Sequence, residues 1–217
     1  DENRRRGKDR PEFELVDTGV FDQDRYFDVF VEYAKAGPED LLMLVSVHNR
    51  GPEAAELHVL PHLWFRNTWS WEADARRPSL FDGGDGVVGV QSRIFGDHRL
   101  FCDGAPELLF CENETNARRL YGYDGAKGPF KDGINDRLVA GDAGAVSADR
   151  SGTKAAAHYR LEVPAGGVAT LRLRLAGVPV TAPFGDFDDV MRLRRAEADE
   201  FYAALQAKIA DPDARAV

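Results

Sequence analysis

The stretch FDVFVEYAKAGPEDLLMLVSV, residues 27–47, decides the fold class of this chain. In its first part, apolar side chains recur at every second position, which predicts a β-strand with one apolar face: Phe27, Val29, Val31 and Tyr33. Residues 41–47 are apolar at almost every position. A strand covered on both faces has this composition, so we expect this segment at the centre of a sheet.

The alternation continues outward and predicts a strand at residues 55–65. Pro61 lies inside it and requires a sheet edge or a bulge, because proline has no N–H to donate. We expect further strands at residues 87–95, 99–102, 108–112, 157–163 and 170–175, with turns at 103–107 and 164–167 between them. Successive hairpins build antiparallel sheets, so the predicted fold is mainly β, an antiparallel β-sandwich.

A single long helix pattern closes the chain. Apolar residues recur at helical spacing from Phe187 to Ile209, and acidic residues at 186, 188 and 189 suit the positive end of the helix dipole. The sequence therefore predicts a β-sandwich domain over residues 1–185 and a helix over residues 186–217.

Composition restricts the class of protein. The chain has 217 residues and a formal charge of −9, which repels both nucleic acid and anionic lipid. We therefore expect neither as a partner, and no apolar run approaches the roughly 20 residues of a membrane span. The charged start lacks the features of a signal peptide, so we expect a cytoplasmic protein in which Cys102 and Cys111 stay reduced, although a hairpin between them would allow a disulfide.

The segment LPHLWFRNTWSW, residues 60–71, holds all three tryptophans of the chain. Indole rings beside a guanidinium and an amide suit a surface that binds sugars, because pyranose C–H faces stack on aromatic rings and polar groups reach the hydroxyls. The alternative is that the segment is a strand end that only contributes side chains to the core, since Trp is mostly buried. We expect Trp64 in the core, with Trp69 and Trp71 pointing the same way.

The familiar signatures of metal, cofactor and phosphate sites are missing from the sequence. His58 and His62 are on a strand, where four residues place them roughly 13 Å apart, too far to share one zinc ion. The glycine-rich residues 84–89 precede a strand, whereas a dinucleotide site links a strand to a helix. We therefore expect no metal and no cofactor.

Two acidic pairs have spacings that can be compared with those of glycosidase residues. Glu112 and Glu114 would lie roughly 7 Å apart on a strand, inside the window for inverting enzymes. Both come from one backbone, however, and the mechanism needs an acid and a base on opposite faces of the sugar. We therefore interpret this pair, and likewise Asp132 and Asp136, as structural and expect no catalytic residue here.

Several blocks of the sequence resemble the bacterial glucosidase-like proteins, which are similar to glycoside hydrolase family 63 and to mannosylglycerate hydrolases. The resemblance covers almost the whole chain. It is carried by EFELVDTGVF (12–21), DRYFDVFVEYAKA (24–36), HNRGPEAA (48–55), LPHLWFRNTWSW (60–71), ENETN (112–116), KDGIND (131–136), GTKAAAHY (152–159) and EADEFYAAL (197–205).

The resemblance implies a longer α-glucosidase-like protein that acts on oligosaccharides. In it, this chain would be the non-catalytic sandwich and the start of a linker helix towards an (α/α)6 barrel that carries the catalytic acid and base. The barrel is expected to share the oligosaccharide with the sandwich. We expect the sugar pocket to be walled by Arg66, Asn67, Trp69, Trp71, Lys131 and Asp132, unless these residues only bury the interface between the domains.

Two other functions stay open from the sequence alone. The chain is either a stand-alone carbohydrate-binding module or, alternatively, a mutarotase-like sugar epimerase. The second alternative requires His58, His98 and His158 to converge on one concave face.

Overall fold

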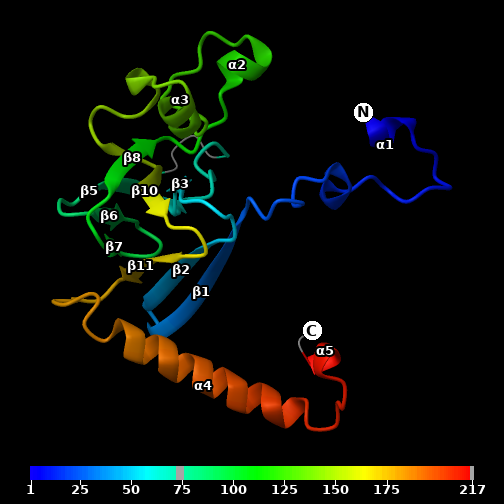
Figure 1. Cartoon of the computed structure of the whole chain (residues 1–217). Coiled ribbons are helices and arrows are strands. Elements are labelled where there is room, and N and C mark those ends of the chain that lie inside the picture. Colours follow the sequence, from blue (N-terminus) through cyan, green and yellow to red (C-terminus); the bar gives the residue numbers. More distant parts are fainter. Residues whose placement is uncertain (72–75, 216–217) are drawn as a thin grey trace.

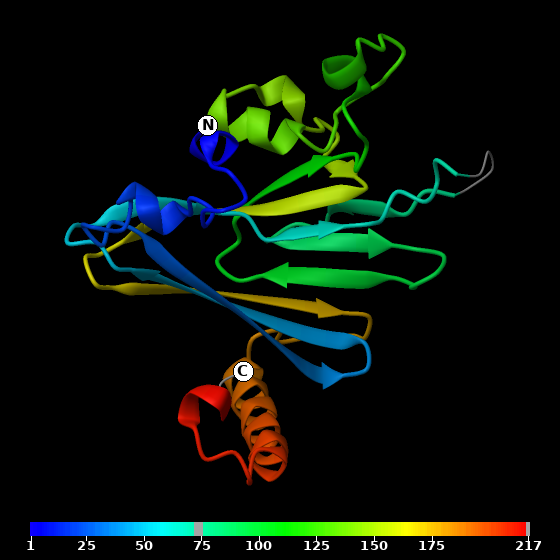
Figure 2. The same ribbon diagram turned by 90° about the vertical axis from the view of Figure 1, so that its right-hand side faces the viewer.

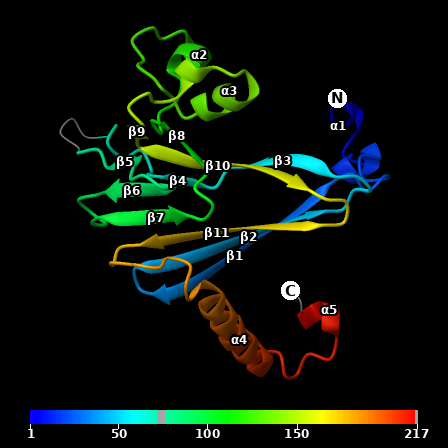
Figure 3. The same ribbon diagram turned by 60° about the vertical axis from the view of Figure 1, so that its left-hand side comes forward.

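The structure, a computed structural model, describes residues 1–71 and 76–215. These residues form two antiparallel sheets packed face to face, with helices on both outer faces (Figures 1 and 3). The prediction of a mainly β, antiparallel sandwich followed by a helix is therefore confirmed. Within the described residues, no helix has the length and apolar character needed to cross a membrane.

The larger sheet has seven strands in the order β1-β2-β11-β7-β6-β5-β9. Their bounds are β1 (Phe27–Gly37), β2 (Asp40–Asn49), β5 (Ser79–Asp82), β6 (Val87–Gln91), β7 (His98–Cys102), β9 (Ser151–Gly152) and β11 (Val168–Ala176). As predicted, β2 is covered on both faces. Val45 and Val47 face the other sheet, and Leu42 packs against the C-terminal helix.

The smaller sheet is built around β10 (Lys154–Val163). On one side of β10 lie β3 (Ala55–Val59) and β4 (His62–Trp64), and on the other lies β8 (Glu107–Cys111). Pro61 separates β3 from β4 at the edge of the sheet, where its carbonyl still accepts a hydrogen bond of 3.0 Å from the Ala157 N–H. The expected edge or bulge at Pro61 is confirmed.

The main core lies between the two sheets and is formed by aliphatic and aromatic residues of both, including Leu80, Val88, Phe110 and Leu173. The apolar face of β1 points to the same side, because Val31 pairs with Val45. Val31 and Tyr33 are nevertheless exposed. The four-stranded sheet is narrower than the seven-stranded one and leaves the edge strand partly uncovered.

Two expected hairpins are wrong. Strands β7 and β8, which flank the turn after Cys102, lie in different sheets, and so do β10 and β11. These turns carry the chain across the sandwich, as Figure 2 shows for its two layers. Cys102 and Cys111 are therefore not hairpin neighbours, and both are free and buried.

Helices cover both outer faces. On the larger sheet lies α4 (Phe187–Leu205), whose Phe187 and Met191 pack on Ala34 and Leu42. The predicted helix is confirmed. It ends at Leu205, although the apolar pattern continues to residue 209. On the smaller sheet lies α3 (Gly133–Val139), with α2 (Ala117–Tyr121) beside it (Figure 3). The remaining helical elements are short: α1 (Glu2–Arg5), η1 (Leu15–Thr18), η2 (Ala143–Ala145) and α5 (Pro212–Arg215).

A buried arginine fixes the start of α4. Arg174 of β11 is almost fully buried and donates to both carboxylate oxygens of Asp40, at 2.8 and 2.6 Å. The same guanidinium donates to the carbonyl of Pro183 at 3.0 Å and to Asp186, the residue before the helix, at 2.5 Å. The helix therefore leaves the sheet in a fixed direction.

Candidate functional site

Part of the sequence-predicted site contacts the segment 112–116, at the end of the smaller sheet where β8 and β4 finish: Asn67, Trp69, Lys131 and Asp132. Arg66 and Trp71 contact each other instead. The centre of the arrangement is the carboxylate of Glu114. It accepts hydrogen bonds from Trp69 Nε1 at 2.7 Å and from Asn67 Nδ2 at 2.8 Å. The Asn67 amide also donates to the Asn113 carbonyl at 3.3 Å. We call these hydrogen bonds of Glu114 with Trp69 and Asn67 the Glu114 clamp, and they fix the turn that follows β4.

The three tryptophans are placed differently from the sequence prediction. Trp69 is only 7% exposed, whereas Trp71 is 66% and Trp64 is 55% exposed. Trp64 was expected in the core, and this prediction is wrong. Trp69 and Trp71 were expected to point the same way, but residue 69 begins a turn, so the alternation of a strand does not apply to them.

The exposed indoles lie along one surface of the smaller sheet. Alternation turns His62, Trp64 and Arg66 outward, and the Arg66 guanidinium lies over the Trp71 ring at 5.2 Å from its centroid. We call these four residues the tryptophan face. Sequence reasoning missed the exposure of Trp64, although its apolar neighbours Leu63 and Phe65, which pack partly buried against the core, carried the signal.

A shallow hollow of about 390 Å³ opens beside Trp64. It is lined by His62, Trp64, Asn113 and Lys154. Partial desolvation of the ring and the positive charge of Lys154 lower the pKa of His62. The imidazole is therefore neutral at pH 7, so it can both donate and accept hydrogen bonds. An indole surface flanked by such groups suits a hydroxylated ring.

Lys131 and Asp132 have different surroundings. Lys131 is exposed, and its backbone links the two parts of the site: its N–H donates to the Glu114 carbonyl, and its carbonyl accepts from Lys154 Nζ, both at 3.1 Å. Asp132 accepts from Asn116 at 3.1 Å and from Arg119 at 2.6 Å. Lys131 therefore lies at the edge of the tryptophan face, whereas Asp132 forms hydrogen bonds within the protein and stabilises its local structure.

Neither acidic pair has the geometry of a glycosidase acid and base. Arg77 lies 3.8 Å from the Glu112 carboxylate and 3.4 Å from that of Glu114, so both acids face one cation on the same side. Glu112 also accepts from the Thr153 hydroxyl at 2.7 Å. Arg119 joins Asp132 to Asp136 in the same manner. These carboxylates stabilise charges of the protein itself.

The three histidines of the epimerase hypothesis do not converge. His58 of β3 and His158 of β10 contact each other on the outer face of the smaller sheet, with nitrogen atoms 2.8 Å apart. His98 begins β7 in the other sheet. Among residues 1–71 and 76–215, no group of three or more His, Cys, Asp or Glu residues is arranged to hold a metal ion.

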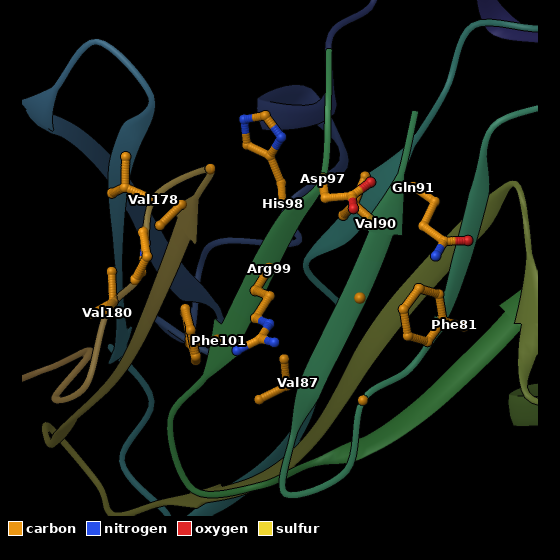
Figure 4. A pocket seen from close by; sticks show the side chains of 15 residues that line it. Phe81, Val87, Val90, Gln91, Asp97, His98, Arg99, Phe101, Val178 and Val180 are labelled. Carbon is orange, nitrogen blue, oxygen red and sulfur yellow. The ribbon is translucent and has the colours of Figure 1, made fainter. Parts of the chain in front are cut away.

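A second hollow, of about 700 Å³, lies on the outer face of the larger sheet (Figure 4). Its walls come from β5, β6, β7 and the segment that follows β11, with Phe81 and Phe101 among the apolar groups and Asp97, His98 and Arg99 among the polar ones. His98 Nδ1 is buried there and has no hydrogen-bond partner among the residues that the structure describes. Because this hollow belongs to the other sheet, it is separate from the tryptophan face.

Comparison with known proteins adds one relative. No family model matches the chain. The chain is similar to the uncharacterised protein YMR196W of Saccharomyces cerevisiae, at 29% identity over 246 residues. The match covers 92% of this chain but only 23% of the yeast protein. The chain thus spans less than a quarter of the length of this curated relative.

Proposed function

We propose that this chain is a non-catalytic β-sandwich module of a longer carbohydrate-active protein of the glycoside hydrolase type. In this proposal the tryptophan face contacts an oligosaccharide, and a helical catalytic domain outside this chain cleaves it. The observation that carries the proposal is the pair of exposed indoles, Trp64 and Trp71, on a surface made rigid by the Glu114 clamp.

Three further observations support this function. Exposed tryptophans that gather on one surface favour an interaction site, and sugars stack on indole rings. Among the described residues, the carboxylates of Glu112 and Glu114 beside the tryptophan face are engaged by Arg77, Thr153, Trp69 and Asn67 and do not form an opposed acid and base. The yeast relative is more than four times longer than the part that matches, so a similar module occurs within a larger protein.

The module's position in the longer protein follows from α4. We infer that residues 186–217 begin the connection to the catalytic domain, because Arg174 anchors the start of the helix while Phe201 and Leu205 near its end are exposed. Apolar residues on a helix that leaves the body of a domain favour further packing. The linker and the barrel remain expectations from the family resemblance.

The test is calorimetric titration of the chain with maltotriose. We expect weak binding with a Kd of about 1 mM, because the hollow is shallow and open. Replacing Trp71 or Trp64 by alanine should each weaken binding about fivefold, within the range of aromatic contacts. The matched control is Phe30→Ala, which removes an exposed aromatic ring from β1. Equal loss in the control, or no binding by the wild-type chain, contradicts the proposal.

A second assay concerns catalysis. The chain should not hydrolyse aryl α-glucosides, because its acidic pairs are bound on one side by arginine. Turnover that disappears in Glu112→Gln or Glu114→Gln would place the chemistry in this module and contradict the non-catalytic assignment.

A further inference from the structure

Strand β1 is an open edge of the larger sheet. It pairs with β2 on one side, and within residues 1–71 and 76–215 no strand pairs with its other side. Figure 2 looks towards this edge and shows β1 in front of β2. Three apolar side chains of the strand are largely exposed: Val29 at 50%, Val31 at 48% and Tyr33 at 63%. A long apolar edge strand is a template for pairing with another chain, because its outer backbone groups lack partners.

The backbone groups at the open edge belong to the odd-numbered residues of β1. At the start of the strand, the Arg50 N–H donates to the Tyr26 carbonyl at 3.0 Å, so these two residues are a hydrogen-bonded pair of the β1–β2 ladder. Hydrogen-bonded pairs alternate along an antiparallel ladder, so the even-numbered residues bond to β2. The N–H and C=O groups of Val29, Val31 and Tyr33 therefore point away from the sheet.

We propose that two copies of this chain pair through β1, antiparallel and about a twofold axis at Val31. The hydrogen bonds of such a pair join residues whose free groups face each other, so odd positions meet odd positions. With the axis at Val31, Val29 of each copy lies opposite Tyr33 of the other. A β-branched side chain directly opposite an aromatic one is a favourable cross-strand pair. The same surface is thus complementary to itself, as a twofold interface requires.

Charge selects this register over the two adjacent ones. A pair centred on Phe30 would set Asp28 against Glu32 twice, and a pair centred on Glu32 would set two Glu32 carboxylates against each other. Like charges directly opposite each other destabilise a sheet. In the pair centred on Val31, Asp28 faces Ala34. Glu32 faces Phe30, so no carboxylates meet.

The edge is long enough and open enough for this contact. The odd-numbered residues from 27 to 35 of both copies would supply about ten hydrogen bonds, the number found in a typical protein interface. Helix α4 contacts β1 through Ala34 and Glu32, whose side chains point to the outer face of the sheet. The helix therefore leaves the backbone groups at the edge accessible.

The test is sedimentation equilibrium of the full chain at increasing concentration. We expect dimers of two 24.0 kDa chains with a Kd of about 10 µM, as for a weak protein interface. Val31→Lys places two ammonium groups side by side at the axis and should weaken the dimer at least about tenfold. Val31 is exposed, so the variant should remain folded, which circular dichroism checks.

The matched control is Phe30→Lys, which adds the same charge on the other face of β1. The new ammonium group would lie opposite Glu32 of the second copy, so the dimer should be as tight as before or tighter. Amide hydrogen exchange gives a second measurement. The N–H groups of Val29, Val31 and Tyr33 should gain protection as the concentration rises, whereas the even-numbered ones, bonded to β2, should be protected at every concentration.

Three results would overturn the proposal. The first is a chain that stays monomeric about tenfold above the expected Kd. The second is a dimer that Phe30→Lys weakens as much as Val31→Lys does. The third is hydrogen exchange at the odd-numbered amides of β1 that does not change with concentration.

Discussion

Replacing Glu114 by alanine should destabilise the whole chain, because one carboxylate holds the turn that carries the tryptophan face. The change removes the acceptor of Trp69 Nε1 at 2.7 Å and of Asn67 Nδ2 at 2.8 Å. Hydrogen bonds to charged groups contribute about 1.5–3 kcal/mol each, and a buried donor left without a partner is costly. Trp69 is such a donor.

The expected loss is about 3 kcal/mol rather than the full sum of two such bonds. The Glu114 side chain is 25% exposed, so water replaces part of the interaction. The Asn67 amide also retains its hydrogen bond to the Asn113 carbonyl. For a chain of this size, about 3 kcal/mol lowers the melting temperature by roughly 10 °C. Glu114→Gln retains one acceptor oxygen and should lose about half as much.

Urea denaturation followed by tryptophan fluorescence measures the difference. The control is Glu200→Ala, which removes an exposed carboxylate from α4 and should change the free energy of unfolding by less than about 0.5 kcal/mol. If Glu114→Ala were as stable as this control, the clamp would not hold the turn and the reasoning would be refuted.

Three other predictions concern the fold. Arg174→Met should lower the free energy of unfolding by about 3–5 kcal/mol in thermal or urea melts, because it leaves the buried Asp40 carboxylate unpaired; unchanged stability contradicts this. Burial raises the pKa of the Cys102 thiol to about 12 and that of Cys111 to about 11, so both stay protonated at pH 8. Mass spectrometry after iodoacetamide treatment at that pH should find neither modified in the folded chain and both modified after denaturation. Gly133→Ala should destabilise the chain, since the added methyl group would lie 1.9 Å from the Ala145 carbonyl oxygen. Gly37→Ala, whose methyl group would meet only Asp40 Cβ at 4.0 Å, should be tolerated when both variants are compared by thermal melting.

The local elements of the fold could be predicted from the sequence, but the assignment of strands to sheets could not. Alternation identified β1, a continuous apolar run identified β2, and the chemistry of proline identified the break at Pro61. Turn residues alone do not show whether the next strand continues the same sheet or crosses to the other one. For this reason the predicted hairpins around residues 103–107 and 164–167 were wrong.

The candidate site was predicted in part. Asn67, Trp69 and Lys131 do contact Glu114, whereas Asp132 contacts Asn116 and Arg119. That these residues wall a sugar pocket, as the resemblance implies, stays a prediction. Which indole faces water depends on where the strand ends. The general preference of tryptophan for burial led to the prediction of Trp64 in the core, although the alternation along its strand turned it outward. The helix α3 was missed because its seven residues are too few for a periodic pattern.

The most direct test of the proposed sugar contact is a nuclear magnetic resonance titration of the three indole N–H signals with maltotriose. The signals of Trp64 and Trp71 should shift together as the saccharide is added, while the Trp69 signal, bound to Glu114 inside the protein, should stay in place. Signals of Trp64 and Trp71 that do not move, or a shift confined to Trp69, would contradict a sugar-binding role for the tryptophan face.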